Sequence, residues 1–397
     1  MHSAARVDWS PYDLGLTADP YPTYRRLREE SPLYYNAEHD FYAVSRFADC
    51  ERGLPDWRTF SSARGGILEF IKSGIEIPPG TLIFEDPSSH DIHRKLLSGV
   101  FTMRRISALE NQVRDYCART LDPLVGADRF DLIGEVGAQL PMRVIGMLLG
   151  IPETDQEALR DSADDSLRTE DGTGMDIRQG AVLTNEMFAD YIDWRRDHPA
   201  GDVMTDLLTA EFVDEHGVRR TLTREEVLTY VTVVAGAGNE TTGRLIGWIG
   251  SVLAKHPEQR REIVDDPALI PGALEEILRY EPPGPFIARY VTADVEFHGQ
   301  TVPQGSAILF IAASANRDER RYPEPDTFDI HRKVGHQLTF GMGVHFCLGA
   351  ALARLEGRVA LEEILRRFPK WDVDWDNAKL AQTSTVRGWE TLPIIIR

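Results

Sequence analysis

Apolar residues recur at helical spacing along most of the longer segments of this chain, which predicts a protein built mainly of α-helices with small β-sheets. One buried stripe is predicted after residue 347, formed by Leu348, Leu352, Leu355, Val359 and Leu365. Thr223 and Glu226 have the spacing of a capping box, and the segment that follows could continue as a helix to about Lys255. At 1.5 Å per residue that helix would be about 45 Å long, so we expect it to cross the centre of the fold.

Shorter segments alternate between apolar and polar residues and predict strands. The stretch LYYNAEHDFYAVSR, residues 33–46, is typical of a hairpin with a turn at AEHD, and residues 289–318 predict a second small sheet. Residues 64–82 combine large apolar side chains with glycine and proline, so we expect a flexible apolar loop there and no regular element. A second loop, acidic and containing glycine, is expected at residues 161–181. No internal repeat or linker marks a boundary, so residues 1–397 are expected to form one domain.

The middle of the long predicted helix contains poor helix formers, namely Gly236, Gly238 and the β-branched pair Thr241 and Thr242. Each glycine costs about 1 kcal/mol relative to alanine inside a helix, so helix stability does not explain their presence. Close packing against a neighbouring element is one explanation. A local opening of the helix at a functional site is the other. The segment by itself favours neither.

A later helix, PGALEEILRY at residues 271–280, carries Glu276 and Arg279 three positions apart, where the two side chains can form an ion pair. Both lie opposite an apolar stripe formed by Leu274, Ile277 and Leu278. Periodicity therefore places the pair in solvent, where it would contribute well under about 1 kcal/mol.

Composition and charge narrow the class of protein and of partner. With 42% hydrophobic and 27% charged residues, the chain has the composition of a folded globular protein. Its formal net charge of -19 would repel nucleic acid and anionic membranes, so a small neutral ligand is the favoured partner. No segment reaches about 18 uninterrupted apolar residues, and the first residues lack the core of a signal peptide. We therefore expect neither a membrane span nor export.

Cysteine is rare in the chain, and the three copies at positions 50, 117 and 347 do not form a disulfide framework. This usage fits a reducing compartment, and the cytoplasm is the expected location. Cys347 lies in the glycine-rich stretch FGMGVHFCLGA, residues 340–350, directly before a strongly helical segment. The helix dipole and the unsatisfied N–H groups at such a position favour a thiolate, the form of cysteine that acts as a nucleophile or metal ligand.

Four roles for Cys347 are open from the residues alone. A buried structural cysteine is the commonest role, although it does not explain the glycine-rich loop. A cysteine–histidine nucleophile could use any of the 11 histidines. A structural zinc site could begin with His336, His345 and Cys347, but a fourth ligand and the usual paired spacing are missing. A haem-iron thiolate needs only one cysteine and a loop that lets the sulfur meet a flat macrocycle.

Residues 340–350 resemble the haem-binding signature of the cytochrome P-450 family, the haem-thiolate monooxygenases, at every constrained position. Residues 237–242 resemble the oxygen-activation motif of the family's central helix, and residues 276–279 its Glu-x-x-Arg pair. Arg332 resembles the arginine that joins this pair, and residues 86–102 resemble a segment with a haem-contacting His and Arg. The resemblance covers nearly the whole chain and is to the soluble bacterial branch, which has no membrane anchor.

The resemblance implies the cytochrome P-450 fold, with haem b held between the long central helix and the helix that follows the cysteine loop. Cys347 would be the axial iron ligand and the only metal ligand from the chain. The other implied haem contacts are His90, Arg94, Ala237, Arg289, Phe340, Gly341, His345 and Gly349. The chain departs from the pattern at Ile92, where many members of the family have arginine, and this bears on the details of propionate binding.

The resemblance also assigns the residues of the central helix. Glu240 and Thr241 would be the catalytic residues that deliver protons, beside a helix opened at Gly238 that admits water. A structural cluster behind the haem is implied as well, which contradicts the periodicity argument for solvent exposure. Its members are Glu276, Arg279 and Arg332.

The implied activity is that of a monooxygenase that inserts one oxygen atom of dioxygen into a hydrophobic small molecule, such as a terpenoid, a fatty acyl compound or a steroid. The implied substrate wall includes Val233, Val234, Ala237, Pro285, Phe286, Ile287, Ser384 and Thr385. Electrons would come from NAD(P)H through a reductase and a ferredoxin, which would dock on a basic patch among Arg104, Arg105, Arg354, Arg358, Arg366 and Arg367. A peroxide-using haem-thiolate enzyme and a haem protein that binds a ligand without turnover are the alternatives.

Overall fold

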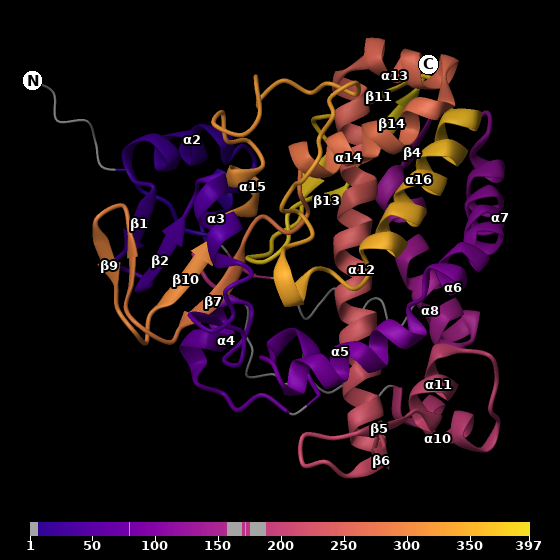
Figure 1. Cartoon of the computed structure of the whole chain (residues 1–397). Coiled ribbons are helices and arrows are strands. Elements are labelled where there is room, and N and C mark those ends of the chain that lie inside the picture. The colour runs from indigo at the N-terminus through magenta and orange to yellow at the C-terminus, as the bar shows by residue number, and fades with distance from the viewer. Residues whose placement is uncertain (1–6, 79, 157–168, 171, 175–187) are drawn as a thin grey trace, which may run out of the picture.

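The structure is a computed structural model of the chain, and it describes residues 7–78, 80–156, 169–170, 172–174 and 188–397 (Figure 1). Helices fill one side of the molecule, and a small sheet with its own flanking helices forms the other (Figure 1). This agrees with the helix-rich fold that the sequence predicts. The acidic loop expected at 161–181 lies almost wholly outside the described residues.

Helix α12, Arg224–Lys255, is the long helix expected from the sequence and runs through the helical side of the molecule (Figure 1). Its first turn has the predicted capping box. The Glu226 N–H donates to Thr223 Oγ1 at 3.2 Å, and the Thr223 N–H donates to the Glu226 carboxylate at 2.7 Å. These two bonds satisfy N–H groups that the start of a helix otherwise leaves free.

Helices α8 (Leu140–Leu149), α14 (Ile270–Tyr280) and α16 (Ala350–Arg367) pack against α12, and α7 (Glu110–Leu121) packs against α16. The stripe predicted after residue 347 is buried on α16, apart from the partly exposed Leu348. Burial of apolar surface between these helices is the main stabilising contribution to the fold. Side chains with almost no exposed surface in this core include Val231, Ile246, Ile249, Val359 and Leu361.

The largest sheet has five strands in the order β1-β2-β10-β7-β3. β1 (Leu33–Asn36) and β2 (Phe41–Val44) form the predicted antiparallel hairpin. β10 (Ala307–Phe310) pairs in parallel with β2 and antiparallel with β7 (Ile287–Val291). The sequence therefore predicts these strands but divides them between two sheets, whereas the pairing of β2 with β10 joins them in one. Pairing between segments so far apart leaves no local pattern that periodicity could detect.

The remaining elements surround these two parts. The other helices are α1 (Leu14–Thr17), α2 (Tyr21–Glu30), α3 (Phe47–Gly53), α5 (Ser89–Val100), α6 (Met103–Ala108), α10 (Ala189–Asp197), α11 (Val203–Thr209), α13 (Pro257–Asp265) and α15 (Ala312–Ala315). Short turns of tighter or wider helix are η1 (Leu82–Phe84), η2 (Asp122–Leu124), η3 (Ile133–Gly137), η4 (Glu153–Asp155), η7 (Pro267–Leu269) and η8 (Gly343–His345). The other strands are β3 (Phe60–Ser61), β4 (Arg129–Asp131), β5 (Glu211–Val213), β6 (Arg219–Thr221), β8 (Val295–Phe297), β9 (Gln300–Val302), β11 (Trp371–Val373), β12 (Lys379–Leu380), β13 (Trp389–Thr391) and β14 (Pro393–Ile396).

Residues 64–82 include a regular element, helix α4 (Leu68–Ser73), so the prediction of a loop throughout was wrong there. Leu68, Phe70 and Ile71 are buried, and α4 packs against β7 and β10. Gly74 ends the helix with a φ of 66°, in the left-handed region. A helix of 6 residues between glycines is too short for helical periodicity to show in the sequence.

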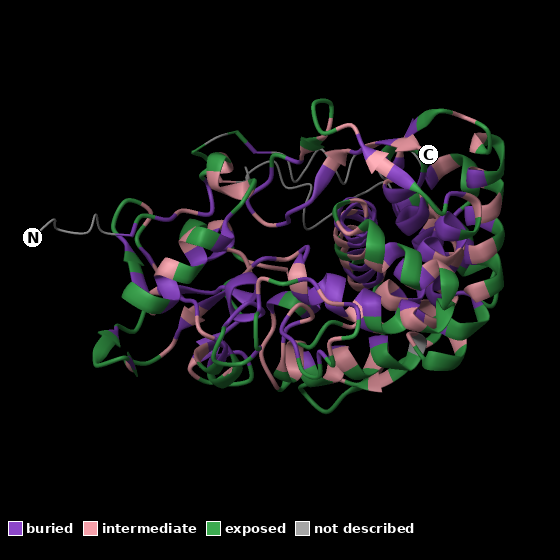
Figure 2. Cartoon of the chain, turned by 90° about the horizontal axis from the view of Figure 1, so that it is seen from above, coloured by how far each residue is buried: buried purple, intermediate pink, exposed green. Residues whose placement is uncertain are grey.

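Buried residues occupy the interior, and exposed residues follow the outer helices and loops (Figure 2). Within the described part of the chain, no helix combines the length and apolar content needed to cross a bilayer. The expectation of one domain over residues 1–397 stays a prediction.

Candidate active site

Cys347 lies at the end of a loop that turns back on itself before α16. The Cys347 N–H donates to the Phe340 carbonyl at 2.8 Å, and the Phe346 N–H donates to the Gly343 carbonyl at 3.1 Å. Gly343 has a φ of 69°, and a Cβ there would lie 2.7 Å from Pro55 Cα, so only glycine fits this position. Cys347 is exposed, whereas the other two cysteines of the chain are buried. The exposed surface of Cys347 favours a role toward a bound group over a buried structural one.

Opposing influences act on the pKa of the Cys347 thiol. Desolvation raises the pKa of the Cys347 thiol, and the N–H groups of Gly349 and Ala350 together with the charges of Arg94 and Arg354 only partly oppose it. A bound metal cation deprotonates a coordinating thiol.

A zinc site is not supported by the same region. Among the described residues, no three or more His, Cys, Asp or Glu side chains are arranged to hold a metal ion together. The single exposed thiol of Cys347 instead suits a metal whose other ligands come from a cofactor.

Four side chains from three elements form a donor cluster close to the cysteine loop: His90 and Arg94 from α5, Arg289 from β7 and His345 from η8. The rings of His90 and His345 have centroids 4.4 Å apart. The Nε2 atom of each ring is buried without a partner among the described residues. Arg94 donates to the Phe346 carbonyl at 2.7 Å, which ties α5 to the cysteine loop.

Burial makes the charged forms of two residues in the donor cluster less favourable. Desolvation, with Arg289 and His90 adding repulsion, lowers the pKa of His345 to about 3. Desolvation also lowers the pKa of Arg289 to about 10, although Asp86 opposes this. Each buried nitrogen without a partner costs about 1–3 kcal/mol. An anion with several acceptor oxygens would relieve both problems, and the two carboxylates of haem fit this description.

Helix α12 exposes Ala237 in the middle of an otherwise well-buried helix, with Val233 and Thr241 half-buried one turn to either side. Thr241 Oγ1 donates to the Ala237 carbonyl at 3.1 Å. An exposed alanine inside a core helix indicates open space beside it, as the wall of a cofactor site requires.

The predicted opening of this helix at Gly238 was wrong, because α12 is continuous from Arg224 to Lys255. A Cβ on Gly238 would lie 2.8 Å from Ile145 Cδ1, and a Cβ on Gly243 would lie 2.6 Å from the Gly137 carbonyl. Close packing against α8 and η3 therefore explains glycine at these positions, which was the other explanation open from the sequence.

Glu240 is next to Thr241 in the chain but forms an ion pair with Arg244, one turn further along α12. Both side chains are nearly buried, with exposed fractions of 6% and 11%. A second guanidinium nitrogen of Arg244 donates to the Trp389 carbonyl. The structure thus places a carboxylate and a hydroxyl on neighbouring positions, and it adds a cation that the sequence analysis missed. The i, i+4 spacing of Glu240 and Arg244 was the available signal.

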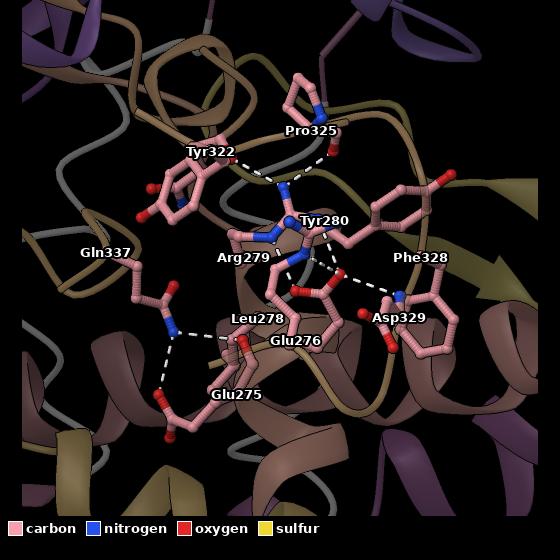
Figure 3. Close-up of polar contacts among 12 residues, drawn as sticks. Glu275, Glu276, Leu278, Arg279, Tyr280, Tyr322, Pro325, Phe328, Asp329 and Gln337 are labelled. Atoms are coloured by element: carbon pink, nitrogen blue, oxygen red, sulfur yellow. Dashed lines mark hydrogen bonds and ion pairs between the residues drawn. The ribbon is translucent and has the colours of Figure 1, made fainter. Parts of the chain in front are cut away.

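Glu276 and Arg279 are completely buried and joined by two bonds of 2.7 Å each, from Arg279 Nε and from one of its terminal nitrogens (Figure 3). Arg332 Nε donates to Glu276 Oε1 at 3.1 Å. Arg279 also donates to the Asn316 and Pro325 carbonyls at 2.9 Å. The cluster implied by the resemblance is therefore present. The periodicity prediction of solvent exposure was wrong because the segment from 316 to 332 covers this face of α14.

The residues expected in a substrate wall are spread over more than one surface. Ile287 approaches the cysteine loop, since a Cβ on Gly341 would lie 3.5 Å from Ile287 Cδ1. Val234 is buried in the core. Phe286 packs against Trp9 with ring centroids 6.1 Å apart. A cavity near the N-terminus is lined by Pro285, Phe286 and Ser384, among other residues.

The C-terminal members of that wall have local partners. Ser384 Oγ donates to Glu69 Oε1 at 2.7 Å, which joins the C-terminal segment to α4. Thr385 is half-buried beside it.

The arginines expected to form a basic patch are mostly paired with acids. Arg354 binds Glu275, and Arg358 binds both Glu110 and Glu362. Arg105, Arg366 and Arg367 are also in ion pairs. The surface of α16 is therefore a network of both charges and not a simple cationic face.

One buried acid near these helices was also missed. Glu356 on α16 is buried, and its Oε2 atom has no hydrogen-bond partner in the described ranges. Burial raises the pKa of Glu356 well above the ordinary value of a glutamate. Nothing in the local sequence distinguishes this glutamate from the exposed acids around it.

A helix-rich fold with one exposed cysteine beside an anion-binding donor cluster is the arrangement of a haem-thiolate protein. The family model for cytochrome P-450 matches residues 268–387. The protein named cytochrome P-450 123 from Mycobacterium tuberculosis is 39% identical over 394 residues, covering 98% of this chain and 96% of the relative. Vitamin D(3) 25-hydroxylase from Pseudonocardia autotrophica is 34% identical over 382 residues, covering 95% of this chain and 93% of the relative.

The solved structure of cytochrome P-450 CYP109Q5 from Chondromyces apiculatus superimposes with a TM-score of 0.86 at 32% identity, covering 98% of both chains. The chain therefore belongs to the cytochrome P-450 family. It is a P-450 monooxygenase, and the family uses haem with an axial cysteine thiolate.

Proposed function

We propose that this monooxygenase oxidises a hydrophobic small molecule with dioxygen, using electrons that reach it from NAD(P)H through a reductase and a ferredoxin. The observation that carries the proposal is the donor cluster beside the exposed thiol of Cys347. Buried imidazole nitrogens without partners and two arginines suit the two carboxylates of haem, which need partners in the protein interior. A cytoplasmic location, as predicted from the cysteine content, is part of this proposal.

The proposed haem contacts follow from this fit. Cys347 would be the axial ligand, and the donor cluster of His90, Arg94, Arg289 and His345 would bind the propionates. When bound, the haem iron supplies the activation of dioxygen, and a thiolate ligand favours cleavage of the O–O bond. The remaining contacts would come from Ala237 on α12 and from the cysteine loop, at Phe340, Gly341 and Gly349.

Proton delivery is proposed for Glu240 and Thr241. The Thr241 hydroxyl lies on the same face of α12 as the exposed Ala237 and is a suitable last donor to the site. Glu240 is a carboxylate on the next position of the helix, with Arg244 as its partner.

The proposed substrate is a hydrophobic molecule of the terpenoid, fatty acyl or steroid class. Support comes from the apolar character of the positions expected to line the site, of which Val233, Ala237 and Ile287 lie on its α12 and cysteine-loop sides. The similarity to a relative named for the hydroxylation of vitamin D(3) agrees with an apolar, polycyclic or steroid-like compound. Pro285, Phe286 and Ser384 would then belong to the entrance, because they line the N-terminal cavity, and Thr385 would join them as the residue next to Ser384.

The proposed electron donor is a ferredoxin. The net charge of -19 means that a small acidic partner would be repelled by most of the surface, so docking needs local cations. The arginines of α16 are ion-paired with acids at the surface. These pairs are half-buried and still reach solvent, so a partner's carboxylates could compete with the internal ones for the arginines.

The experiment is reconstitution of the purified haem-loaded protein with a ferredoxin, its reductase and NAD(P)H, followed by a screen of apolar compounds. We expect substrate-dependent consumption of NAD(P)H and an oxygenated product that contains label from ¹⁸O₂. Product formation only with added peroxide would favour the peroxide-using alternative. Ligand binding without any turnover would favour a haem protein that binds without catalysis.

A further inference from the structure

Glu85 ends the segment of residues 80–85 that contains η1, called the η1 loop below, and it contacts three other parts of the molecule. Its Oε1 atom accepts a hydrogen bond from the Gly80 N–H at 2.7 Å, and its Oε2 atom lies 2.6 Å from His93 Nδ1 on α5. The Glu85 backbone interacts with His345 of the donor cluster. This one residue therefore joins the start of the η1 loop, helix α5 and the cysteine loop.

The pair formed by His93 and Glu85 is nearly buried, with exposed side-chain fractions of 6% and 11%. His93 also packs edge-on against Tyr230 of α12, with ring centroids 5.8 Å apart. A buried polar pair contributes little stability that apolar side chains of similar volume would not supply. Its distinct effect is directional, because a carboxylate oxygen accepts a hydrogen bond only where an N–H group points at it. Glu85 thus fixes the conformation of the η1 loop relative to α5 and α12.

Ile83 is the exposed apolar side chain of the η1 loop. It is 42% exposed, although its neighbours Leu82 and Phe84 are buried. On one side, η1 packs against α12. On the other, a Cβ added to Gly66 would lie 3.2 Å from Phe84 Cε1 and 3.8 Å from Nη1 of Arg289, a member of the donor cluster. The η1 loop therefore runs from α12 to the donor cluster, which are two sides of the proposed haem site, and Ile83 lies between them.

We propose that Glu85 is a positioning residue for substrate binding, which together with His93 clamps the η1 loop so that Ile83 forms a fixed apolar wall of the substrate site. The inference rests on the proposed function, because it assigns a hydrophobic substrate to the space beside α12. A wall that is held in one place limits the shape of the compound that fits. Ile83 is then the residue that determines specificity, and Glu85 acts through it.

The test titrates the haem-loaded protein with two probe ligands whose nitrogen binds haem iron, imidazole and the larger 4-phenylimidazole, and follows the Soret band. The double variant Glu85→Leu/His93→Leu removes the clamp. Replacing both members of a buried pair by apolar side chains leaves no uncompensated charge, so this variant should fold. The matched control is Glu262→Leu/His331→Leu, since these two residues form a histidine–glutamate pair at the surface.

In the variant without the clamp we expect about tenfold weaker binding of 4-phenylimidazole and unchanged binding of imidazole. A loop that is in place about a tenth of the time weakens by that factor only the ligands that need it. Hydrogen exchange gives a second readout, because the Phe84 N–H donates to the Thr81 carbonyl at 2.7 Å within the η1 loop. This amide should exchange about tenfold faster once the loop is released. The control variant should leave both measurements unchanged.

A further variant, Ile83→Phe, separates the wall from the clamp. The larger side chain should weaken 4-phenylimidazole about tenfold by filling its space, while imidazole binding and exchange of the Phe84 amide stay unchanged. Unchanged affinity for 4-phenylimidazole in either variant would overturn the inference. Equal losses for both probes would overturn it as well, because they would indicate damage to the haem site itself. Absence of NAD(P)H-dependent oxidation in the unmodified protein would instead contradict the proposed function, which these titrations do not measure.

Discussion

The rings of His90 and His345 lie with centroids 4.4 Å apart, and the Nε2 atom of each is buried without a partner in the described part of the chain. His90 lies on α5 and His345 lies on η8, so the two residues are far apart in the sequence. Two ring nitrogens without a partner at one place are a cost that folding alone does not explain. Binding of an anionic group does explain them.

His90→Leu and His345→Leu should therefore weaken haem binding without weakening the haem-free fold. The loss of a hydrogen bond to a carboxylate predicts a rise of about tenfold in the rate of haem transfer to a scavenging apoprotein. The free energy of unfolding of the haem-free chain should stay the same or increase, because the unsatisfied nitrogen is removed.

Urea unfolding and haem transfer, measured on the same preparations, separate the two effects. His331→Leu is the control, since His331 is exposed and pairs with Glu262 at the surface. Equal destabilisation with and without haem would mean that the histidines serve the fold and not the cofactor.

Thr241→Ala should keep the binding of haem and substrate but divert electrons from product to peroxide. The reason is that Thr241 supplies the hydroxyl on the exposed face of α12, next to Glu240, the other residue proposed for proton delivery. General acid–base groups contribute about 10²–10⁴-fold, so most of the coupling between NAD(P)H use and product should be lost. Peroxide and product are measured together in one reaction. Unchanged coupling would remove Thr241 from the mechanism.

Glu276→Gln should strongly destabilise the protein, because it leaves the completely buried guanidinium of Arg279 without its anion. Breaking a buried pair costs about 3–5 kcal/mol, measurable by urea unfolding of the haem-loaded protein. Glu30→Gln removes an acid from the exposed pair with Arg26 and should leave the unfolding midpoint unchanged. A small effect at Glu276 would contradict the structural role given to this cluster.

Two glutamates of α16 should contribute to the pH dependence of stability with opposite signs. Burial raises the pKa of Glu356 in the folded chain, so its contribution falls as pH rises above about 4.3, the value in an unfolded chain. Glu356→Gln should therefore stabilise the protein at neutral pH, and the gain should shrink as pH falls toward 4.3.

Glu363 is the matched control in the same helix. Desolvation alone would raise the pKa of Glu363, but hydrogen bonds from Arg367 and Arg114 outweigh it and lower the pKa. Glu363→Gln should therefore destabilise the protein at neutral pH, with the loss shrinking as pH falls through the lowered pKa. Unfolding free energies of both variants between pH 4 and 8 test the signs, and parallel curves would refute the assignment for Glu356.

Local patterns in the sequence predict much of the helical architecture. The capping box of Thr223 and Glu226 and the end at Lys255 place α12 correctly, because both signals lie within the helix itself. Features that depend on distant segments are missed. The pairing of β2 with β10 and the covering of Glu276 by residues 316–332 are set by tertiary contacts, which local periodicity cannot contain.

The sequence likewise predicts some features of the candidate site and misses others. The position of Cys347 before a helix and between glycines is visible in the sequence, and its exposure agrees with a ligand role. The opening expected at Gly238 was wrong, because the contact with Ile145 that explains this glycine comes from another helix. Arg244 was overlooked although its spacing from Glu240 is local, since many such pairs on helices have no function.

The role of Cys347 as haem ligand is tested by the visible spectrum of the purified protein, reduced with dithionite and exposed to carbon monoxide. We expect a strongly red-shifted Soret band that is lost in Cys347→Ser and retained in Cys117→Ala, whose cysteine is buried. A protein that stays colourless after expression with added haem, or a shifted band that survives Cys347→Ser, would contradict it.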